Sequence, residues 1–224
     1  MDKEAILVKH KRNINLLFRT VGNSLIILSL FFLALGFWPY LSAEIKYNWN
    51  QLIGQRFVVK GDSSVAAAGP PPIPITPVNT DFAIVIPKID VNANVTANVD
   101  PTSYDAYASA LAKGAAHARG TVLPGQDGNS YIFAHSSLNF WDIYRYNSVF
   151  TLLRKVEVGD LVAVFYQGNR YDYKVVDKKI VPPTDTSILT SKADGKQLTL
   201  QTCDPPGLNL NRLVVIAKMT SQSP

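Results

Sequence analysis

The stretch LTLQTC at residues 198–203, followed by RLVVI at residues 212–216, decides the fold of this chain. Apolar and polar residues alternate through the first stretch, which is the period of a strand with one buried face. The sequence DPPG at residues 204–207 then ends that strand, because its prolines lack backbone donors and its glycine allows a sharp corner. The pattern therefore predicts two adjacent strands, with Cys203 at the exit of one and Arg212 at the entry of the next.

Further strand patterns come earlier in the chain, separated by turn residues. They lie at residues 82–86, 91–97, 114–117, 131–135, 161–166 and 171–176. Gly168-Asn169, between the last two, is typical of a hairpin. Asp100-Pro101-Thr102-Ser103 is expected to open a short helix, and residues 139–153 are expected to form a broken one. These patterns predict a mainly β fold, a closed barrel or a sandwich with a few short helices.

The N-terminal region has the composition of a membrane anchor. Residues 1–20 are short and basic, and residues 21–40 carry no charge and are dominated by apolar side chains. About 20 apolar residues suffice to cross the hydrocarbon layer. The basic flank predicts a cytoplasmic N-terminus and an extracellular domain, with Pro39 helping to end the helix. A cleaved signal peptide is the alternative, but the apolar run is long for one and no small-x-small exit follows it.

The remaining chain divides into a linker and one domain. Residues 41–81 are expected to be a juxtamembrane and proline-rich linker, extended and semi-rigid, that holds the domain away from the membrane. Residues 82–224 are expected to form the folded domain, and a domain of this size buries a core without disulfides.

The charge does not favour nucleic-acid binding, and the cysteine content excludes a disulfide framework. The net charge of +5 is spread along the chain, which does not favour nucleic-acid binding. The single cysteine cannot form an intramolecular disulfide, so it is either a buried inert thiol or a reactive one. No metal-binding cluster, phosphate-binding loop or dinucleotide motif is visible, so no metal and no cofactor is expected.

A nucleophilic Cys203 needs a base and a group that stabilises negative charge. Of the three histidines, His10 lies on the cytoplasmic side of the predicted anchor, which leaves His117 and His135. His135 is preferred because it ends an apolar strand, as Cys203 does. Arg212 cannot lose its charge and offers a fixed fork of donors, so it could stabilise an oxyanion. Each of these residues could instead be an ordinary core or surface group.

TLQTC at residues 199–203 with RLVV at residues 212–215 resembles the TLxTC…R signature of sortases, the cell-wall cysteine transpeptidases. Other parts are similar to the family as well. They are IPKI at 86–89, Lys113-Gly114 to His117, Gly120-Thr121, Pro124-Gly125, Gly128-Asn129 and Val158-Gly159-Asp160. The resemblance covers roughly residues 82–219.

The resemblance implies an eight-stranded sortase β-barrel in which Cys203 is the nucleophile and His135 the general acid and base. Arg212 would bind the oxyanion or position the substrate, and Thr202 would place a hydroxyl near the substrate. The expected reaction cleaves an LPxTG-like sorting motif on a surface protein or pilin. A thioacyl enzyme forms, and its acyl group passes to an amine of a cell-wall precursor or a pilin lysine.

Two positions depart from the family pattern. Ala134 stands where a glycine usually precedes the histidine, and the carboxylate of Asp204 follows the cysteine, where it would oppose thiolate formation unless it points away. The loop from Cys203 to Arg212 is similar to pilin-polymerising members, yet residues 61–81 lack their Asp-Pro-aromatic lid. The competing interpretations are another Cys/His acyl-transferase, such as an L,D-transpeptidase, and a non-catalytic membrane-tethered β-domain that binds a surface partner.

Overall fold

A computed structural model describes residues 3–62, 69–136, 148–190, 193–206 and 209–223 of this chain. The chain divides into two compact units, residues up to Pro39 and residues from Tyr40 onward.

The N-terminal unit belongs to helix α1, Lys3–Leu52. Its segment Arg12–Trp38 has a mean hydropathy of 2.0, and by length and composition it could cross a membrane. The prediction that Pro39 helps to end the helix was wrong, since α1 continues to Leu52. A proline removes one backbone donor, and the loss of one hydrogen bond does not end this helix.

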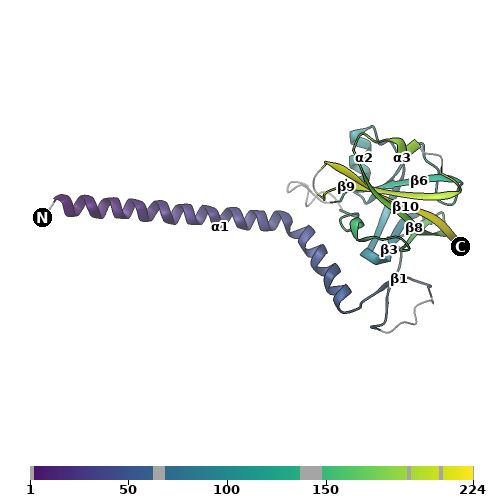
Figure 1. The fold of residues 1–224 in the computed structure, drawn as a ribbon, viewed down its shortest axis with the longest axis horizontal. Helices are drawn as coiled ribbons and strands as arrows, with labels where there is room; N and C mark the ends of the chain where they lie inside the picture. The colour runs from purple at the N-terminus through teal and green to yellow at the C-terminus, as the bar shows by residue number, and fades with distance from the viewer. Residues whose placement is uncertain (1–2, 63–68, 137–147, 191–192, 207–208, 224) are drawn as a thin grey trace. The chain divides into compact units, whose positions relative to one another are not determined.

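The second unit contains a closed eight-stranded β-barrel, which confirms the predicted fold class (Figure 1). The strand order around the barrel is β10-β8-β7-β3-β4-β5-β6-β9. The strands are β3 Phe82–Ile86, β4 Val91–Val99, β5 Ala115–Ala118, β6 Gly128–Phe133, β7 Leu161–Tyr166, β8 Asn169–Val181, β9 Lys196–Asp204 and β10 Asn211–Ser223. Parallel pairs, β4 with β5 and β6 with β9, alternate with antiparallel ones around the site described below.

Short helices connect the strands. They are the 3-10 turns η1 Pro87–Ile89 and η2 Leu153–Lys155 and the helices α2 Tyr104–Leu111 and α3 Ser187–Thr190. The predicted broken helix at residues 139–153 falls partly outside the described residues, and its described end forms the start of η2. The strand predicted at residues 131–135 begins earlier, at Gly128, and ends at Phe133, two residues before the histidine.

Alternation along β9 builds two layers of packing. Leu198 and Leu200 are fully buried in the main core inside the barrel. Thr199, on the opposite face, is also fully buried and its hydroxyl donates to Asn129 Oδ1 at 2.7 Å. Asn129 in turn donates to the backbone oxygen of Ile188 in α3. The outer face of this strand is therefore covered, which holds β9 rigidly on both sides.

The segment before the barrel is more structured than the predicted spacer. Strand β1, Phe57–Val59, pairs in parallel with β2, Ile73–Ile75, so two parts of the expected linker form a small sheet. Val59 and Ile75 are buried in a cluster with Ala83, Val85, Ala163 and Phe165 of β3 and β7. The apolar side chains of this segment explain the difference, because burying them against the barrel removes them from water.

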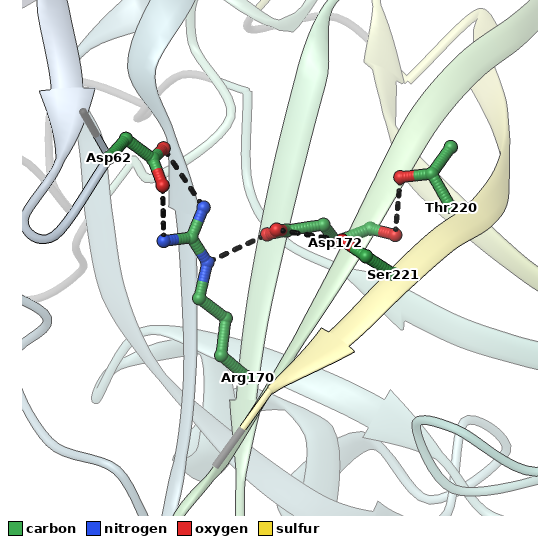
Figure 2. Close-up of polar contacts among 5 residues, drawn as sticks. All are labelled: Asp62, Arg170, Asp172, Thr220 and Ser221. Atoms are coloured by element: carbon green, nitrogen blue, oxygen red, sulfur yellow. Dashed lines mark hydrogen bonds and ion pairs between the residues drawn. The ribbon is translucent and has the colours of Figure 1, made fainter. Parts of the chain in front are cut away.

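A half-buried arginine fixes this segment to the barrel (Figure 2). Arg170 of β8 forms two hydrogen bonds with the carboxylate of Asp62, at 2.7 and 2.9 Å, and a third with Asp172 at 2.8 Å. Only 13% of the Arg170 side chain is exposed. Ser221 of β10 donates to the same Asp172 carboxylate, and Thr220 donates to the Asp172 backbone oxygen. The network therefore connects Asp62, before the barrel, to β8 and β10.

We predict that Arg170→Ala lowers the free energy of unfolding by about 2–4 kcal/mol, because two partly buried carboxylates lose their cation. Asp62→Ala should cost less, since Arg170 keeps Asp172. Lys46→Ala is the matched control: Lys46 pairs with Asp90, but its side chain is 66% exposed, and such pairs contribute about 1 kcal/mol or less. Denaturant unfolding of the full chain in detergent measures the three values. A cost for Arg170→Ala no larger than that of the control would contradict the anchoring role.

Candidate active site

Cys203 and Arg212 lie directly opposite each other on adjacent antiparallel strands. The register pairs Cys203 of β9 with Arg212 of β10. Arg212 Nη1 lies 3.8 Å from Cys203 Sγ, within hydrogen-bonding reach of sulfur. The thiol is partly buried. The two residues that the sequence placed at a strand exit and a strand entry are therefore brought together at one end of the barrel.

The parallel pairing of β6 with β9 brings His135 to the same end. Phe133 is aligned with Gln201, and the N–H of Ala134 donates to the Gln201 oxygen at 3.1 Å. His135 comes two residues after Phe133, as Cys203 comes two residues after Gln201. Because the strands run parallel, the chain leaves β6 toward His135 at the end of the barrel where β9 carries Cys203. The backbone oxygen of half-buried His135 accepts from Phe150 N–H at 3.0 Å, which fixes its main chain.

Thr202 is buried rather than exposed to a ligand. Its hydroxyl donates to the Ala134 backbone oxygen at 2.8 Å. This bond joins β9 to the residue that precedes His135, so Thr202 helps to hold the cysteine and histidine segments together. Its expected role toward the substrate stays a prediction.

The thiol is subject to two opposing electrostatic effects. Burial raises the pKa of Cys203, because a thiolate is poorly solvated there, and the positive charge of Arg212 lowers that pKa in part. The net direction is upward, so the resting cysteine is mainly a thiol at neutral pH.

The carboxylate of Asp204 is held by another cation. Arg154 Nη2 lies 2.9 Å from Asp204 Oδ1, and the Asp204 side chain is 12% exposed. The alternation of β9 turns neighbouring side chains to opposite faces. The positive charge of Arg154 therefore compensates the negative charge of Asp204, which weakens the opposition of this carboxylate to thiolate formation at Cys203.

Three polar residues near the site were missed by reasoning from the sequence. Asn209 Oδ1 accepts from Arg212 Nη1 and lies 3.7 Å from Cys203 Sγ. The hydroxyl of Tyr131 donates to Gln201, and burial raises the Tyr131 pKa against the effect of Arg212. Burial raises the Tyr107 pKa, Tyr104 and Cys203 add to the increase, and Arg212 opposes it.

Only Asn209 carried a usable sequence signal, since it lies in the short loop between Cys203 and Arg212. Tyr107 and Tyr131 are separated from residue 203 by long stretches of chain. Their position beside the site depends on the closure of the barrel, which no local pattern reports.

His117, the other candidate base, is a fully buried core residue. Asn98 N–H lies 3.4 Å from Nδ1, and Nε2 lies 2.9 Å from the Val122 oxygen. In this arrangement Nδ1 accepts and the Nε2 hydrogen is donated, so the ring is neutral. Burial lowers the pKa of His117, which agrees with a neutral ring. Within the described parts of the chain, no group of three or more His, Cys, Asp or Glu side chains could hold a metal ion.

Comparison with known proteins identifies the family of the barrel domain. The model of the sortase domain matches residues 84–220. Sortase D of Bacillus subtilis (strain 168) is 28% identical over 120 residues, which cover 54% of this chain and 52% of that protein. The chain thus spans about half the length of this curated relative.

Two solved structures are similar in fold and sequence. Sortase A from Corynebacterium diphtheriae is 29% identical with a TM-score of 0.54, over 65% of this chain and 63% of that chain. Sortase C of Streptococcus pneumoniae is 28% identical with a TM-score of 0.53, over 64% of this chain and 70% of that chain. Because the family match takes in all eight barrel strands except the ends of the first and last, this chain belongs to the sortase family.

Proposed function

We propose that this protein is a membrane-anchored cysteine transpeptidase that cleaves an LPxTG-like sorting motif and transfers the acyl group to an amine. The observation that carries the proposal is the cross-strand pair of Cys203 and Arg212, 3.8 Å apart, at the barrel end where β6 ends, two residues before His135. Membership of the sortase family supports the same reaction.

The first half of the proposed reaction forms a thioester. His135 takes the thiol proton, and Cys203 Sγ bonds to the carbonyl carbon of the scissile peptide while the C=O electron pair moves to oxygen. Arg212 donates to that oxyanion, where a fixed cation acts more strongly than in bulk water. When the C–N bond breaks, the departing amine takes the proton from His135, and the acyl group stays on sulfur.

The second half reverses these steps with a different amine. The incoming amine attacks the thioester carbonyl and gives a proton to His135, and Arg212 again donates to the oxyanion. The C–S bond then breaks and sulfur leaves as a thiolate, which takes the proton back. The raised pKa of Cys203 favours this return to the resting thiol.

Surface proteins or pilins are the proposed substrates, and a cell-wall precursor or a pilin lysine supplies the proposed amine. A similar solved structure, the Streptococcus pneumoniae sortase C, is described with pilin substrate specificity. The neighbouring structures also include sortases A and D. Measuring acyl transfer to each of the two amines would therefore decide between cell-wall anchoring and pilin polymerisation.

We expect Cys203→Ala to abolish cleavage of an LPxTG-like peptide while the barrel stays folded, because a small side chain replaces another at a strand end.

Arg212→Ala should lower kcat/KM about 10²–10³-fold, the size of a lost oxyanion donor. Arg212→Lys should recover part of that loss, since lysine keeps the charge without the planar fork. The assay is peptide cleavage with circular dichroism as the folding control. Substantial turnover by folded Cys203→Ala would refute the cysteine mechanism.

His135→Ala should lower kcat/KM about 10²–10⁴-fold, as expected for a lost general acid and base. His117→Gln is the matched control and should keep most activity, although the loss of buried hydrogen bonds of the ring should cost about 1–3 kcal/mol of stability.

The stability of His117→Gln should also depend on pH differently from that of the wild type. Burial lowers the folded pKa of His117, so the unfolded chain binds a proton at higher pH than the folded chain. Stability should therefore fall as the pH drops below the unfolded value of about 6.5, and His117→Gln should lack this component. Cleavage and unfolding measured at neutral and mildly acidic pH test both points. An active His135→Ala beside a folded but inactive His117→Gln would reverse the assignment of the two histidines.

We further propose that residues 21–40 are a retained anchor and that the catalytic domain, residues 82–224, lies outside the cell, with residues 1–20 in the cytoplasm. The basic N-terminal flank and the apolar segment of α1 support this orientation. Protease added to intact cells or protoplasts should digest the domain and leave a membrane-bound N-terminal fragment. Full protection of the domain, or a mature N-terminus after Tyr40, would contradict this topology.

A further inference from the structure

The side-chain amide of Asn209 occupies the space between the two groups that the proposed reaction uses. Asn209 Oδ1 accepts a hydrogen bond from Arg212 Nη1 and lies 3.7 Å from Cys203 Sγ, where it can accept the thiol hydrogen. Asn209 lies in the loop between β9 and β10, and its side chain is exposed. One carbonyl oxygen therefore contacts both the nucleophile and the cation.

The donors of Arg212 Nη1 are saturated in this arrangement. This nitrogen carries two hydrogens. It faces three acceptors, Asn209 Oδ1, Cys203 Sγ at 3.8 Å and the Asn211 backbone oxygen at 3.2 Å. A substrate carbonyl that used the same nitrogen would have to displace one of them. Asn209 is the acceptor most easily displaced, because it is a side chain in an exposed loop, whereas Asn211 O belongs to β10.

The chemistry of the asparagine side chain matches that of a scissile peptide. Both are planar amides with a carbonyl oxygen that accepts from an arginine. Both place that oxygen near the sulfur: Asn209 does so at 3.7 Å, and a peptide must do so for attack. Exchanging one for the other conserves the hydrogen bond to Arg212, so the exchange loses no charge-assisted contact.

We propose that Asn209 is a displaceable occupant of the acyl-carbonyl site, which keeps Cys203 as an unreactive thiol until a substrate carbonyl replaces it. The proposal rests on the proposed roles of Cys203 and Arg212. Asn209 accepts the S–H hydrogen and attracts the guanidinium, and both contacts favour the protonated sulfur over the thiolate. Asn209 is therefore a positioning residue that acts through the thiol and the arginine.

Other groups around the sulfur set the background for this effect. They are Arg212 from β10, Tyr107 from α2 and His135 beyond the end of β6, while Asp204 is paired with Arg154. Of these groups, only Arg212 contacts Asn209 directly among the hydrogen bonds of the described residues. A change in thiol reactivity in an Asn209 variant would therefore report on the contacts of Asn209 with Cys203 and Arg212.

The test measures alkylation of Cys203 by iodoacetamide across the neutral pH range in the full chain in detergent. Cys203 is the only cysteine, so the label reports one site. Asn209→Ala should be alkylated about two- to tenfold faster at neutral pH, the effect of removing one hydrogen bond from the thiol form. Asn209→Asp should be alkylated more slowly, because a carboxylate holds Arg212 more strongly and repels the thiolate. Leu210→Ala, in the same loop and 62% exposed, is the matched control and should be unchanged.

Peptide cleavage separates displacement from simple support of Arg212. If Asn209 must leave the site, Asn209→Ala should lower KM and keep kcat close to that of the wild type. If Asn209 only holds Arg212 in place, the same variant should lower kcat and slow alkylation, which would overturn the proposal, as would alkylation at the wild-type rate. Failure of the proposed function would give a different result. In that case Cys203→Ala would still cleave the peptide, whatever the alkylation rates of the Asn209 variants.

Discussion

The site depends on the position of β9 between a parallel and an antiparallel neighbour. The parallel pairing with β6 aligns Phe133 with Gln201, and the antiparallel pairing with β10 aligns Cys203 with Arg212. The direction of each pairing matters. A parallel neighbour brings its own C-terminal end, and therefore His135, to the end where Cys203 emerges. An antiparallel neighbour brings its N-terminal end, and therefore Arg212. β9 thus pairs directly with the strand that carries Arg212 and with the strand that leads to His135.

The rigidity of β9 comes from burial on both faces. Leu198 and Leu200 pack inside the barrel, and Thr199 bonds to Asn129 on the outside. Thr202 extends the same rigidity to the end of the strand, since its hydroxyl is bonded to Ala134. A shift of one residue in the register of β9 would exchange its two faces and would move Cys203 away from Arg212. The apolar core therefore also determines the geometry at the strand ends.

Local pattern was sufficient to predict the barrel strands and the elements that carry the cysteine and the arginine. Period-two alternation marks β9, and the following prolines mark its end, because both effects act between neighbours in sequence. Long-range closure was not predictable in this way. Some interactions join residues whose proximity depends on the completed fold. They are the contacts of Asn209, the electrostatic influence of Arg212 on Tyr107, and the ion pair between Asp62 and Arg170. The small sheet in residues 57–75 was not predictable for a related reason: the prolines there are compatible with both an extended spacer and a strand, and the pairing of β1 with β2 depends on the completed fold.

The electrostatics of Cys203 suit the proposed enzyme, in which the thiol stays protonated until a substrate binds. A permanently ionised thiol would be open to oxidation and alkylation, because the thiolate is the reactive form. Burial raises the Cys203 pKa, and Arg212 only partly reverses this. A site with a permanent thiolate would instead need the cation to outweigh burial, with no other acceptor on Arg212. In this protein Arg212 Nη1 already donates to Asn209 and the Asn211 backbone. The charge that would stabilise a thiolate is therefore shared with oxygens, and in the proposed reaction it becomes available to the reacting atoms when a substrate carbonyl replaces one of them.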